Sequence, residues 1–185
     1  MLPSEFHIKI DEERELRLIS MSDAVALAAL IDQGRPYLRE WMGWVDTSQT
    51  VEDSREYLRY ELGRYHNRES LQMTLLYRGN IAGQLGFNTI YWRSRRTEIG
   101  YWLGEQYQGR GLMTDAVKAM TTYGFRSLGM HRIEIRCAVD NRKSRAVPER
   151  LDFQQEGILR DNEWLYDHFV GHVVYSMLEN EWRPA

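Results

Sequence analysis

The chain has 185 residues, of which 43% are hydrophobic, and its formal net charge is -3. This length fits one domain, residues 1–185, with a sizeable core, and the weak negative charge argues against a nucleic-acid partner. No apolar run approaches the roughly 20 residues that a membrane-spanning helix needs. No basic start followed by an apolar stretch marks a signal peptide. We therefore expect a soluble, cytoplasmic protein with no membrane partner.

Cysteine and histidine give no indication of a disulfide or a metal site. Cys137 is the single cysteine, so no internal disulfide can form and a reducing compartment is expected. It lies in an alternating apolar run, which favours a buried core thiol. His168 and His172 are four residues apart on a predicted strand, without an evident third ligand. The other histidines are His7, His66 and His131, and we expect no metal.

The N-terminal half predicts one strand around Leu16, followed by two helices. Each helix opens on a capping signal, in which a serine or threonine precedes an aspartate by three residues. Gly34 and Pro36 are expected to stop the first helix. The capping signals and helices are Ser20–Asp23 before Ala24–Ile31, and Thr50–Asp53 before a helix that runs to about Asn67.

The C-terminal half predicts six strands and two helices. The strands are Leu71–Tyr77, Ile81–Tyr91, Thr97–Leu103, Arg132–Val139, Phe153–Leu159 and Phe169–Met177, and the helices are Leu112–Leu128 and Lys143–Arg150. This order predicts an α+β, layered α/β fold, in which helices flank a mixed, mostly antiparallel sheet. The helix Leu112–Leu128 should connect two parallel strands in a right-handed crossover.

The loop Gln106–Gly111 is the most informative segment, because it follows a predicted strand and opens a helix. Backbone N–H groups at a helix start and the helix dipole together attract a phosphate or pyrophosphate. Gly109 and Gly111 let the backbone approach a ligand and adopt positive φ, and Arg110 adds a positive charge. The loop lacks the Walker A ending and the dinucleotide-binding spacing. Taken alone, a tight glycine turn would explain the same residues.

Two segments carry a resemblance to a known family. Gln106–Gly111 matches the Gln/Arg-x-x-Gly-x-Gly/Ala signature of the GCN5-related N-acetyltransferases, and Asn141–Phe153 resembles their Asn-x-x-Ser/Ala, short helix, Gly-Phe landmark. With the strand Glu98–Leu103 and the early Trp-x-x-Trp patch, the chain resembles the RimJ/RimL branch, bacterial enzymes similar to ribosomal-protein N-terminal acetyltransferases. The resemblance covers residues 16–182 and implies a GNAT-type fold with a central β-α-β unit.

Two positions depart from the family pattern. Asp152 stands where the family has glycine before Phe153, and we expect it to keep the left-handed turn, which aspartate tolerates better than most residues. Pro148 stands where many members have a tyrosine acid, which argues against a tyrosine acid at this position.

The resemblance implies acetyl-CoA as cosubstrate, with its pyrophosphate held by the loop and the helix start. The backbone of Trp102 and Leu103 should pair with the pantetheine amides like an added strand. Asn141 should contact the pantetheine arm, although capping the following helix is its alternative role. The expected cofactor-binding residues are Trp102, Leu103, Gln106, Gln108, Gly109, Arg110, Gly111, Leu112, Met113, Thr114, Asn141 and Arg145.

Transfer to an amine requires a base for the amine and a proton donor for the departing thiolate. Glu98 is the expected base, with Glu105 as the alternative; an ordinary solvated carboxylate is the other explanation for either residue. Ser144 is the expected acid because position 148 lacks tyrosine; an ordinary first-turn serine is the alternative. The acceptor cleft is expected to involve four aromatic residues that would otherwise belong to the core, Trp41, Trp44, Tyr91 and Trp92.

These residues predict an acetyl-CoA-dependent N-acetyltransferase that acts on a protein N-terminal amine. The alternatives are an acetyltransferase for a polyamine, an aminoglycoside or an amino acid, and a non-catalytic acyl-CoA sensor. Exposed aromatic residues and the apolar C-terminal strand are compatible with a homodimer.

Overall fold

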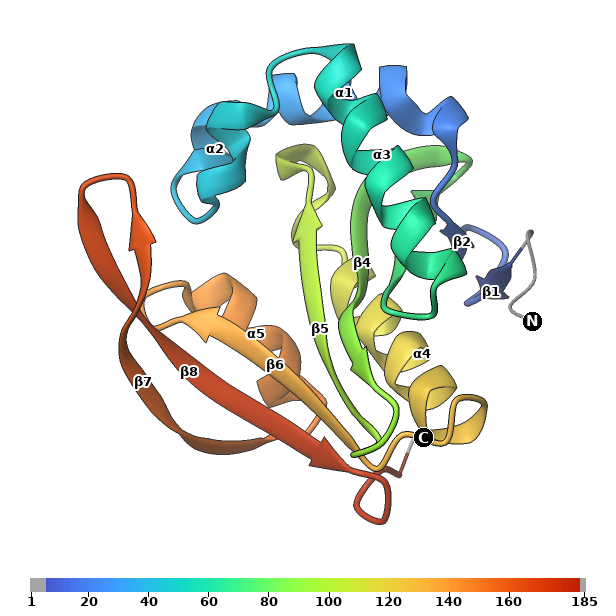
Figure 1. Ribbon diagram of the computed structural model, residues 1–185, viewed down its shortest axis with the longest axis vertical. Coiled ribbons are helices and arrows are strands. Elements are labelled where there is room, and N and C mark those ends of the chain that lie inside the picture. Colours follow the sequence, from blue (N-terminus) through green and yellow to red (C-terminus); the bar gives the residue numbers. More distant parts are fainter. Residues whose placement is uncertain (1–5, 184–185) are drawn as a thin grey trace.

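The computed structural model describes residues 6–183, in which eight strands form a sheet of order β1-β2-β3-β4-β5-β6-β8-β7 (Figure 1). Neighbouring strands are antiparallel, except for the parallel pair β5 and β6. This confirms the predicted mixed, mostly antiparallel sheet. The strands are β1 His7–Lys9, β2 Arg14–Leu18, β3 Leu71–Tyr77, β4 Asn80–Tyr91, β5 Arg96–Leu103, β6 Arg132–Ala138, β7 Gln154–Leu165 and β8 His168–Leu178.

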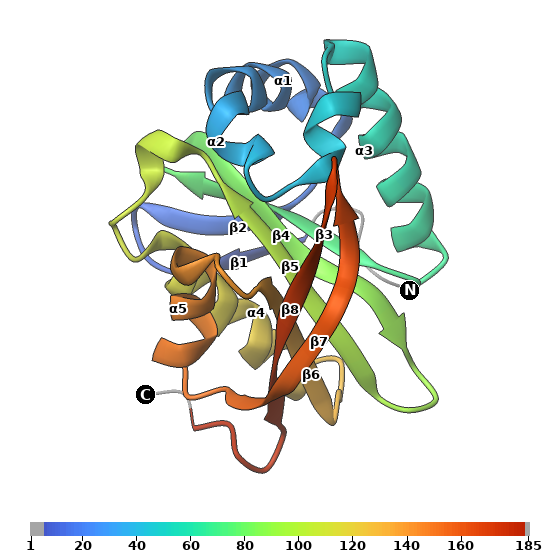
Figure 2. The same cartoon turned by 90° about the vertical axis from the view of Figure 1, so that its left-hand side faces the viewer.

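Helices cover both faces of the sheet. Figure 2 shows α1, α2 and α3 on one side and α4 and α5 on the other. The helix bounds are α1 Ala24–Gln33, α2 Arg35–Arg39, α3 Val51–His66, α4 Leu112–Arg126 and α5 Arg142–Arg150. No helix in the described residues is long and apolar enough to cross a bilayer. Residues 1–5, where the sequence shows no signal-peptide pattern, lie outside the described part of the chain.

Both predicted capping signals are present. The Thr50 hydroxyl accepts a hydrogen bond from the Asp53 N–H at 3.1 Å, and the Asp53 carboxylate accepts from the Thr50 N–H at 2.8 Å. Ser20 and Asp23 form the equivalent box ahead of a 3₁₀ turn that leads into α1. The predicted stop is only partly correct: α1 ends at Gln33, but α2 begins at once with Pro36 in its first turn, where a missing N–H costs no hydrogen bond.

Strand β6 shows the predicted alternation of core and charged side chains. Ile133, Ile135 and Cys137 are buried in the core that α4 covers, which confirms Cys137 as a core thiol. Arg132 and Arg136 lie on the opposite face of the strand, where α4 does not cover them.

The parallel strands β5 and β6 separate before they end. Their pairs run from Arg96–Arg132 through Thr97–Ile133 to Glu98–Glu134, and the register between the two strands stops there. Figure 1 shows the two strands moving apart beyond this point, toward the loop before α4. The second half of β5 therefore has a backbone edge that β6 does not cover, as the resemblance implied.

The C-terminal hairpin is longer than the sequence predicted. β7 continues to Leu165 rather than ending near Leu159, across a register shift against β8. Its turn reaches the α2 side of the molecule, where the Tyr166 hydroxyl donates to the Met42 carbonyl at 2.8 Å. The hairpin thus forms a wall beside the opening between β5 and β6.

Candidate active site

Two cavities meet where β5 leaves β6. The first, here called the loop cavity, has a volume of about 750 Å³ and lies among the loop before α4, the end of β5, and α5. The second, the sheet cavity, has about 690 Å³ and lies between α1, α3 and strands β4 to β8. The residues that line both cavities are Trp41, Met42, Tyr101, Trp102, Asn141 and Ser144.

The loop before α4 has the backbone that an anion site requires. Gly109 and Gly111 have φ angles of 72° and 73°, a left-handed conformation that costs residues with a Cβ about 1–2 kcal/mol. Gly111 caps α4, so the first N–H groups of the helix, from Leu112 to Thr114, have no acceptor within it. These residues line the loop cavity, and their N–H groups and the helix dipole favour a negative ligand.

The side chains around this loop are also suited to phosphate. Arg110, Lys143 and Arg150 line the loop cavity, whereas its carboxylate, Asp115, is ion-paired with Arg14.

Gln108 completes this side of the cavity. Lys143 Nζ donates to Gln108 Oε1 at 3.0 Å. Gln108 Nε2 is buried and has no hydrogen-bond partner among residues 6–183. A phosphate-bearing ligand would satisfy this donor and balance the cations.

Two expected cofactor contacts lie elsewhere. Gln106 donates to Gln33 at 3.3 Å, and Arg145 donates to the Tyr175 hydroxyl at 3.0 Å and the Val139 carbonyl at 2.9 Å. Neither side chain lines the loop cavity, so contact of these two residues with the cofactor remains a prediction.

The helix geometry of α5 explains why the Arg145 side chain points away from the loop cavity. Residues two apart on a helix point to nearly opposite sides, so Arg145 faces away from the side that Lys143 presents to the cavity. Arg150 follows Lys143 by seven residues and shares its face. This spacing is a sequence signal that the two cations lie on one face, although it does not show which face meets the loop.

Ser144 belongs to a cluster of proton-bearing groups at the junction of the cavities. Its hydroxyl oxygen lies 3.2 Å from Cys137 Sγ and 3.3 Å from the Tyr101 hydroxyl, either of which can accept its one proton, while the Tyr101 hydroxyl donates to the Ser144 carbonyl at 2.8 Å. Burial raises the pKa of Tyr101 well above its ordinary value and also raises the pKa of the Cys137 thiol. Both groups therefore carry their protons at neutral pH. Asn141 has the capping role at this helix, because its Oδ1 accepts a hydrogen bond from the Ser144 N–H.

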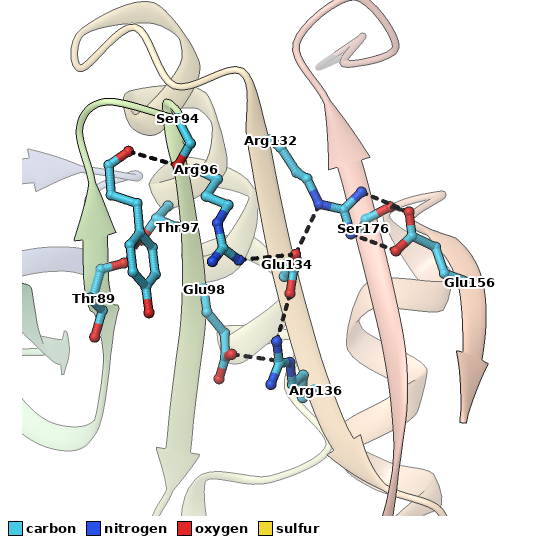
Figure 3. Close-up of polar contacts among 11 residues, drawn as sticks. Thr89, Ser94, Arg96, Thr97, Glu98, Arg132, Glu134, Arg136, Glu156 and Ser176 are labelled. Carbon is cyan, nitrogen blue, oxygen red and sulfur yellow. Dashed lines mark hydrogen bonds and ion pairs between the residues drawn. The ribbon is translucent and has the colours of Figure 1, made fainter. Parts of the chain in front are cut away.

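Glu98 lines the sheet cavity, with a third of its side chain exposed. Arg136 Nε lies 3.2 Å from its Oε2, and Asn88 Nδ2 lies 3.5 Å from its Oε1. Figure 3 shows Glu98 on β5 facing Arg136 on β6. Glu105, the alternative base, is exposed on a 3₁₀ turn and lines neither cavity.

The sheet cavity has a further carboxylate, Glu163, that the sequence did not indicate as a site residue. Glu163 lies 3.1 Å from His172 Nε2, and both residues line the cavity from the C-terminal hairpin. The strand predicted from the sequence ends at Leu159, so Glu163 lies outside every predicted element.

The four aromatic residues expected in the acceptor cleft divide into two pairs. Trp41 and Trp44 line the sheet cavity, and the Trp44 ring lies 5.8 Å from that of Trp102. Tyr91 is covered by the Arg96 guanidinium, and Trp92 Nε1 donates to the Arg68 carbonyl at 2.6 Å. Tyr91 and Trp92 line neither cavity, because β4 carries them to the opposite end of the sheet from the opening.

The described histidines, cysteine and carboxylates do not gather into a metal-binding group. Within residues 6–183, no three or more of these side chains lie close enough to hold a metal ion. His172 is occupied by Glu163, and His168 Nδ1 lies 2.7 Å from Asp167.

Known proteins resemble this chain along almost its whole length. Residues 14–154 match the model of the acetyltransferase (GNAT) domain. YdaF of Bacillus subtilis (strain 168) is 36% identical over 181 residues, which cover 96% of this chain and 98% of YdaF. The ribosomal-protein-serine acetyltransferase of Escherichia coli (strain K12) is 31% identical over 172 residues, which cover 92% of this chain and 96% of the acetyltransferase.

Solved structures share the fold. RimL, a ribosomal L7/L12 α-N-protein acetyltransferase solved in complex with coenzyme A, has a TM-score of 0.91 and 27% identity, with 94% of this chain and 98% of RimL covered. The microcin C7 self-immunity acetyltransferase MccE, solved with acetyl-CoA and AMP, has a TM-score of 0.88 and 30% identity, with 92% of this chain and 95% of MccE covered. The resemblance to RimJ/RimL proteins is thereby confirmed, and the chain belongs to the GNAT acetyltransferase family.

Proposed function

We propose that this chain is an acetyl-CoA-dependent N-acetyltransferase whose acceptor is a protein N-terminal α-amine. The observation that carries the proposal is the meeting of a cationic loop cavity and a separate sheet cavity at Ser144. Such an arrangement brings a thioester from one side and an amine from the other. Relatives named as ribosomal-protein acetyltransferases support this type of acceptor.

The loop cavity would hold acetyl-CoA through groups already described. The N–H groups from Gly109 to Thr114 and the cations Arg110, Lys143 and Arg150 would bind phosphates. The free edge of β5 at Trp102 would pair with the amides of the pantetheine arm.

Acetyl-CoA supplies an acetyl thioester; in the transfer, the amine nitrogen bonds to the acetyl carbon, the carbon–sulfur bond breaks, and the thiolate takes up a proton. Residues of this chain accept and donate the protons. Glu98 takes the proton that the amine loses, directly or through a water in the sheet cavity. The Ser144 hydroxyl, held beside Tyr101 and Cys137, supplies the proton to the sulfur.

The sheet cavity favours a peptide over a polyamine. Its lining carboxylates already have partners. Glu61 and Glu98 are paired with Arg64 and Arg136, Glu163 lies 3.1 Å from His172, and Asp53 accepts from the backbone N–H groups of Gln49 and Thr50. A polyamine would require a series of free carboxylates. A peptide backbone would instead satisfy buried polar atoms of the wall. Ser54 Oγ and Gln84 Nε2 are such atoms, since neither has a hydrogen-bond partner among the described residues.

The test of the function is release of free thiol from acetyl-CoA with a panel of acceptors. We expect turnover with peptides that have a free N-terminus and none with the same peptides acetylated beforehand. Turnover restricted to small amines would overturn the peptide assignment. Coenzyme A binding without transfer to any amine would establish the sensor alternative.

The base can be assigned with two matched variants of the sheet cavity. We expect Glu98→Gln to lower kcat by about 100-fold or more, the usual contribution of a general base. Glu163→Gln removes another carboxylate of the same cavity and should have the smaller effect. The reverse order of the two losses would assign the base to Glu163 with His172.

We further propose a cytoplasmic location in a bacterium, in line with the bacterial relatives. The exposed Ile158, Trp164 and Phe169 of the C-terminal hairpin are the surface on which we expect a homodimer. Light scattering of the purified chain would measure its oligomeric state.

A further inference from the structure

We propose that Arg136 is a positioning residue, which holds the carboxylate of Glu98 in place while Glu134 holds Arg136. The inference rests on the proposed function, in which Glu98 acts as the base. It concerns the array of charged side chains that crosses the sheet in Figure 3.

The register between β5 and β6 places the three side chains together. Glu98 and Glu134 form the last pair before the strands separate, and Arg136 follows Glu134 by two residues on the same face. One guanidinium therefore contacts two carboxylates. Arg136 Nε lies 3.2 Å from Glu98 Oε2, and its Nη2 donates to Glu134 Oε2 at 3.0 Å.

Glu134 is a firm anchor for this guanidinium. It is 7% exposed, and its other oxygen accepts from Arg132 Nε at 2.9 Å. Although burial acts to raise its pKa, the hydrogen bonds from Arg132 and Arg136 hold the pKa of Glu134 below its usual range. Glu134 thus remains charged at neutral pH, and its charge-assisted hydrogen bond fixes the direction in which Arg136 points.

Asn88 holds Glu98 from the other side. Its Oδ1 accepts from Gln72 Nε2 at 3.3 Å, which orients the amide so that Nδ2 faces Glu98 Oε1 at 3.5 Å. Gly100 leaves room for this amide, because a Cβ there would lie 2.7 Å from Asn88 Nδ2. Glu98 is therefore held between an amide on β4 and a guanidinium on β6.

This arrangement matters because β6 leaves β5 immediately after Glu98. A glutamate side chain at the edge of a cavity has several rotamers, and most of them direct the carboxylate away from an acceptor. A displacement of about 1 Å at a reacting group can cost 100-fold in rate. Arg136 would remove this freedom by tying Glu98 to a guanidinium that the buried Glu134 holds.

The test compares Arg136→Gln, Arg136→Lys and the control Arg55→Gln. Arg55 is an arginine of α3 that pairs with Glu52 at 3.1 Å, and it lines neither cavity. We expect Arg136→Gln to lower kcat by about 10- to 100-fold, with the KM for acetyl-CoA unchanged. Arg136→Lys should recover part of the loss, and Arg55→Gln should keep the wild-type kcat.

A double variant separates positioning from a merely structural role. If Arg136 acts through Glu98, adding Arg136→Gln to Glu98→Gln should cause no further loss of kcat. Losses that multiply, or a wild-type kcat for Arg136→Gln in a folded protein with an inactive Glu98→Gln, would overturn the inference alone. A wild-type kcat for Glu98→Gln would instead overturn the proposed base. Thermal unfolding of every variant verifies that the folded state is retained.

Discussion

At the scale of single residues, the position of Ser144 combines a predictable part with an unpredictable one. The Asn-x-x-Ser motif places the serine in the first turn of α5, where Asn141 caps it. Its two partners come from β5 and β6, and Tyr101 is 43 residues away in sequence. Local patterns therefore identify the serine, whereas only the folded sheet shows the phenol that lies beside it.

Replacement of Tyr101 with phenylalanine should impair the reaction without impairing cofactor binding. The change removes the donor to the Ser144 carbonyl and the acceptor of the Ser144 hydroxyl, so the serine loses its orientation. We expect kcat to fall by about 10-fold and the free energy of unfolding by about 1–2 kcal/mol. The KM for acetyl-CoA should stay constant.

Steady-state kinetics and urea unfolding measure these effects. Tyr60→Phe, which removes a phenol that is 64% exposed, is the control and should change neither quantity. An unchanged kcat for Tyr101→Phe would show that Ser144 does not depend on the phenol.

At the scale of elements, the loop before α4 is the part of the site most fully determined by sequence. A left-handed conformation is a property of the local backbone, so glycine at 109 and 111 predicted the positive φ values that the structure has. The same reasoning holds for Asp152, whose φ of 57° confirms the expected left-handed turn.

Element ends were less predictable, because a strand ends where its partner ends. The polar residues at 160–163 interrupt the alternation expected for β7. The register with β8 shifts after Leu159 and resumes at Glu163, which pairs with Val170. Glu163 and its partner His172 were missed for this reason. Likewise, the face of α5 that meets the loop depends on how the helix packs, and the sequence does not show that Lys143 lies on this face.

Gly111→Ala should weaken acetyl-CoA binding specifically. A Cβ at a φ of 73° strains the cap of α4 and turns its first N–H groups away from the phosphate position. We expect the KM for acetyl-CoA to rise by about 10-fold, which corresponds to about 1.4 kcal/mol, with little change in kcat.

Gly129→Ala is the matched control for this prediction. Gly129 also has a positive φ, 65°, and open space around its Cα, so alanine there carries the same backbone strain outside both cavities. It should lower the melting temperature as much as Gly111→Ala and leave the KM unchanged. If Gly129→Ala raised the KM as much as Gly111→Ala, backbone strain rather than loss of the anion site would explain the weaker binding of acetyl-CoA.

At the scale of the whole molecule, the opening between β5 and β6 divides the sheet into two parts that share a short parallel ladder. The order of elements predicted this β-α-β unit, but the cavities formed by distant segments could not be derived from it. Tyr91 and Trp92 were placed in the acceptor cleft because local sequence does not show to which end of the sheet a strand carries its side chains.

Ion pairs reinforce the sheet on the far side of this opening. Arg132 on β6 contacts Glu134 on its own strand and Glu156 on β7, and Ser176 on β8 also donates to Glu156 at 2.8 Å (Figure 3). The array links β6 with the C-terminal hairpin, which carries Glu163 and His172 into the sheet cavity. Its strength should therefore affect how firmly that wall is held.

The link between Arg132 and Glu156 predicts a pH-dependent stability. Hydrogen bonds from Arg132 lower the pKa of Glu156 from 4.5 to about 2. Because the folded-state pKa is depressed, the stabilisation is complete above pH 4.5 and is lost as the pH falls toward 2. Glu156→Gln should thus reduce the free energy of unfolding at pH 7 by about 1 kcal/mol, a modest value because the carboxylate keeps 40% of its exposure and is screened by solvent. Urea unfolding at pH 7, 4 and 3 should show the difference from wild type shrinking in that order.

Glu12→Gln is the control for this prediction. It removes an exposed pair with Lys9 and should match wild type at each pH. A difference for Glu156→Gln that stays constant down to pH 3 would mean that its carboxylate is not held by Arg132 in solution.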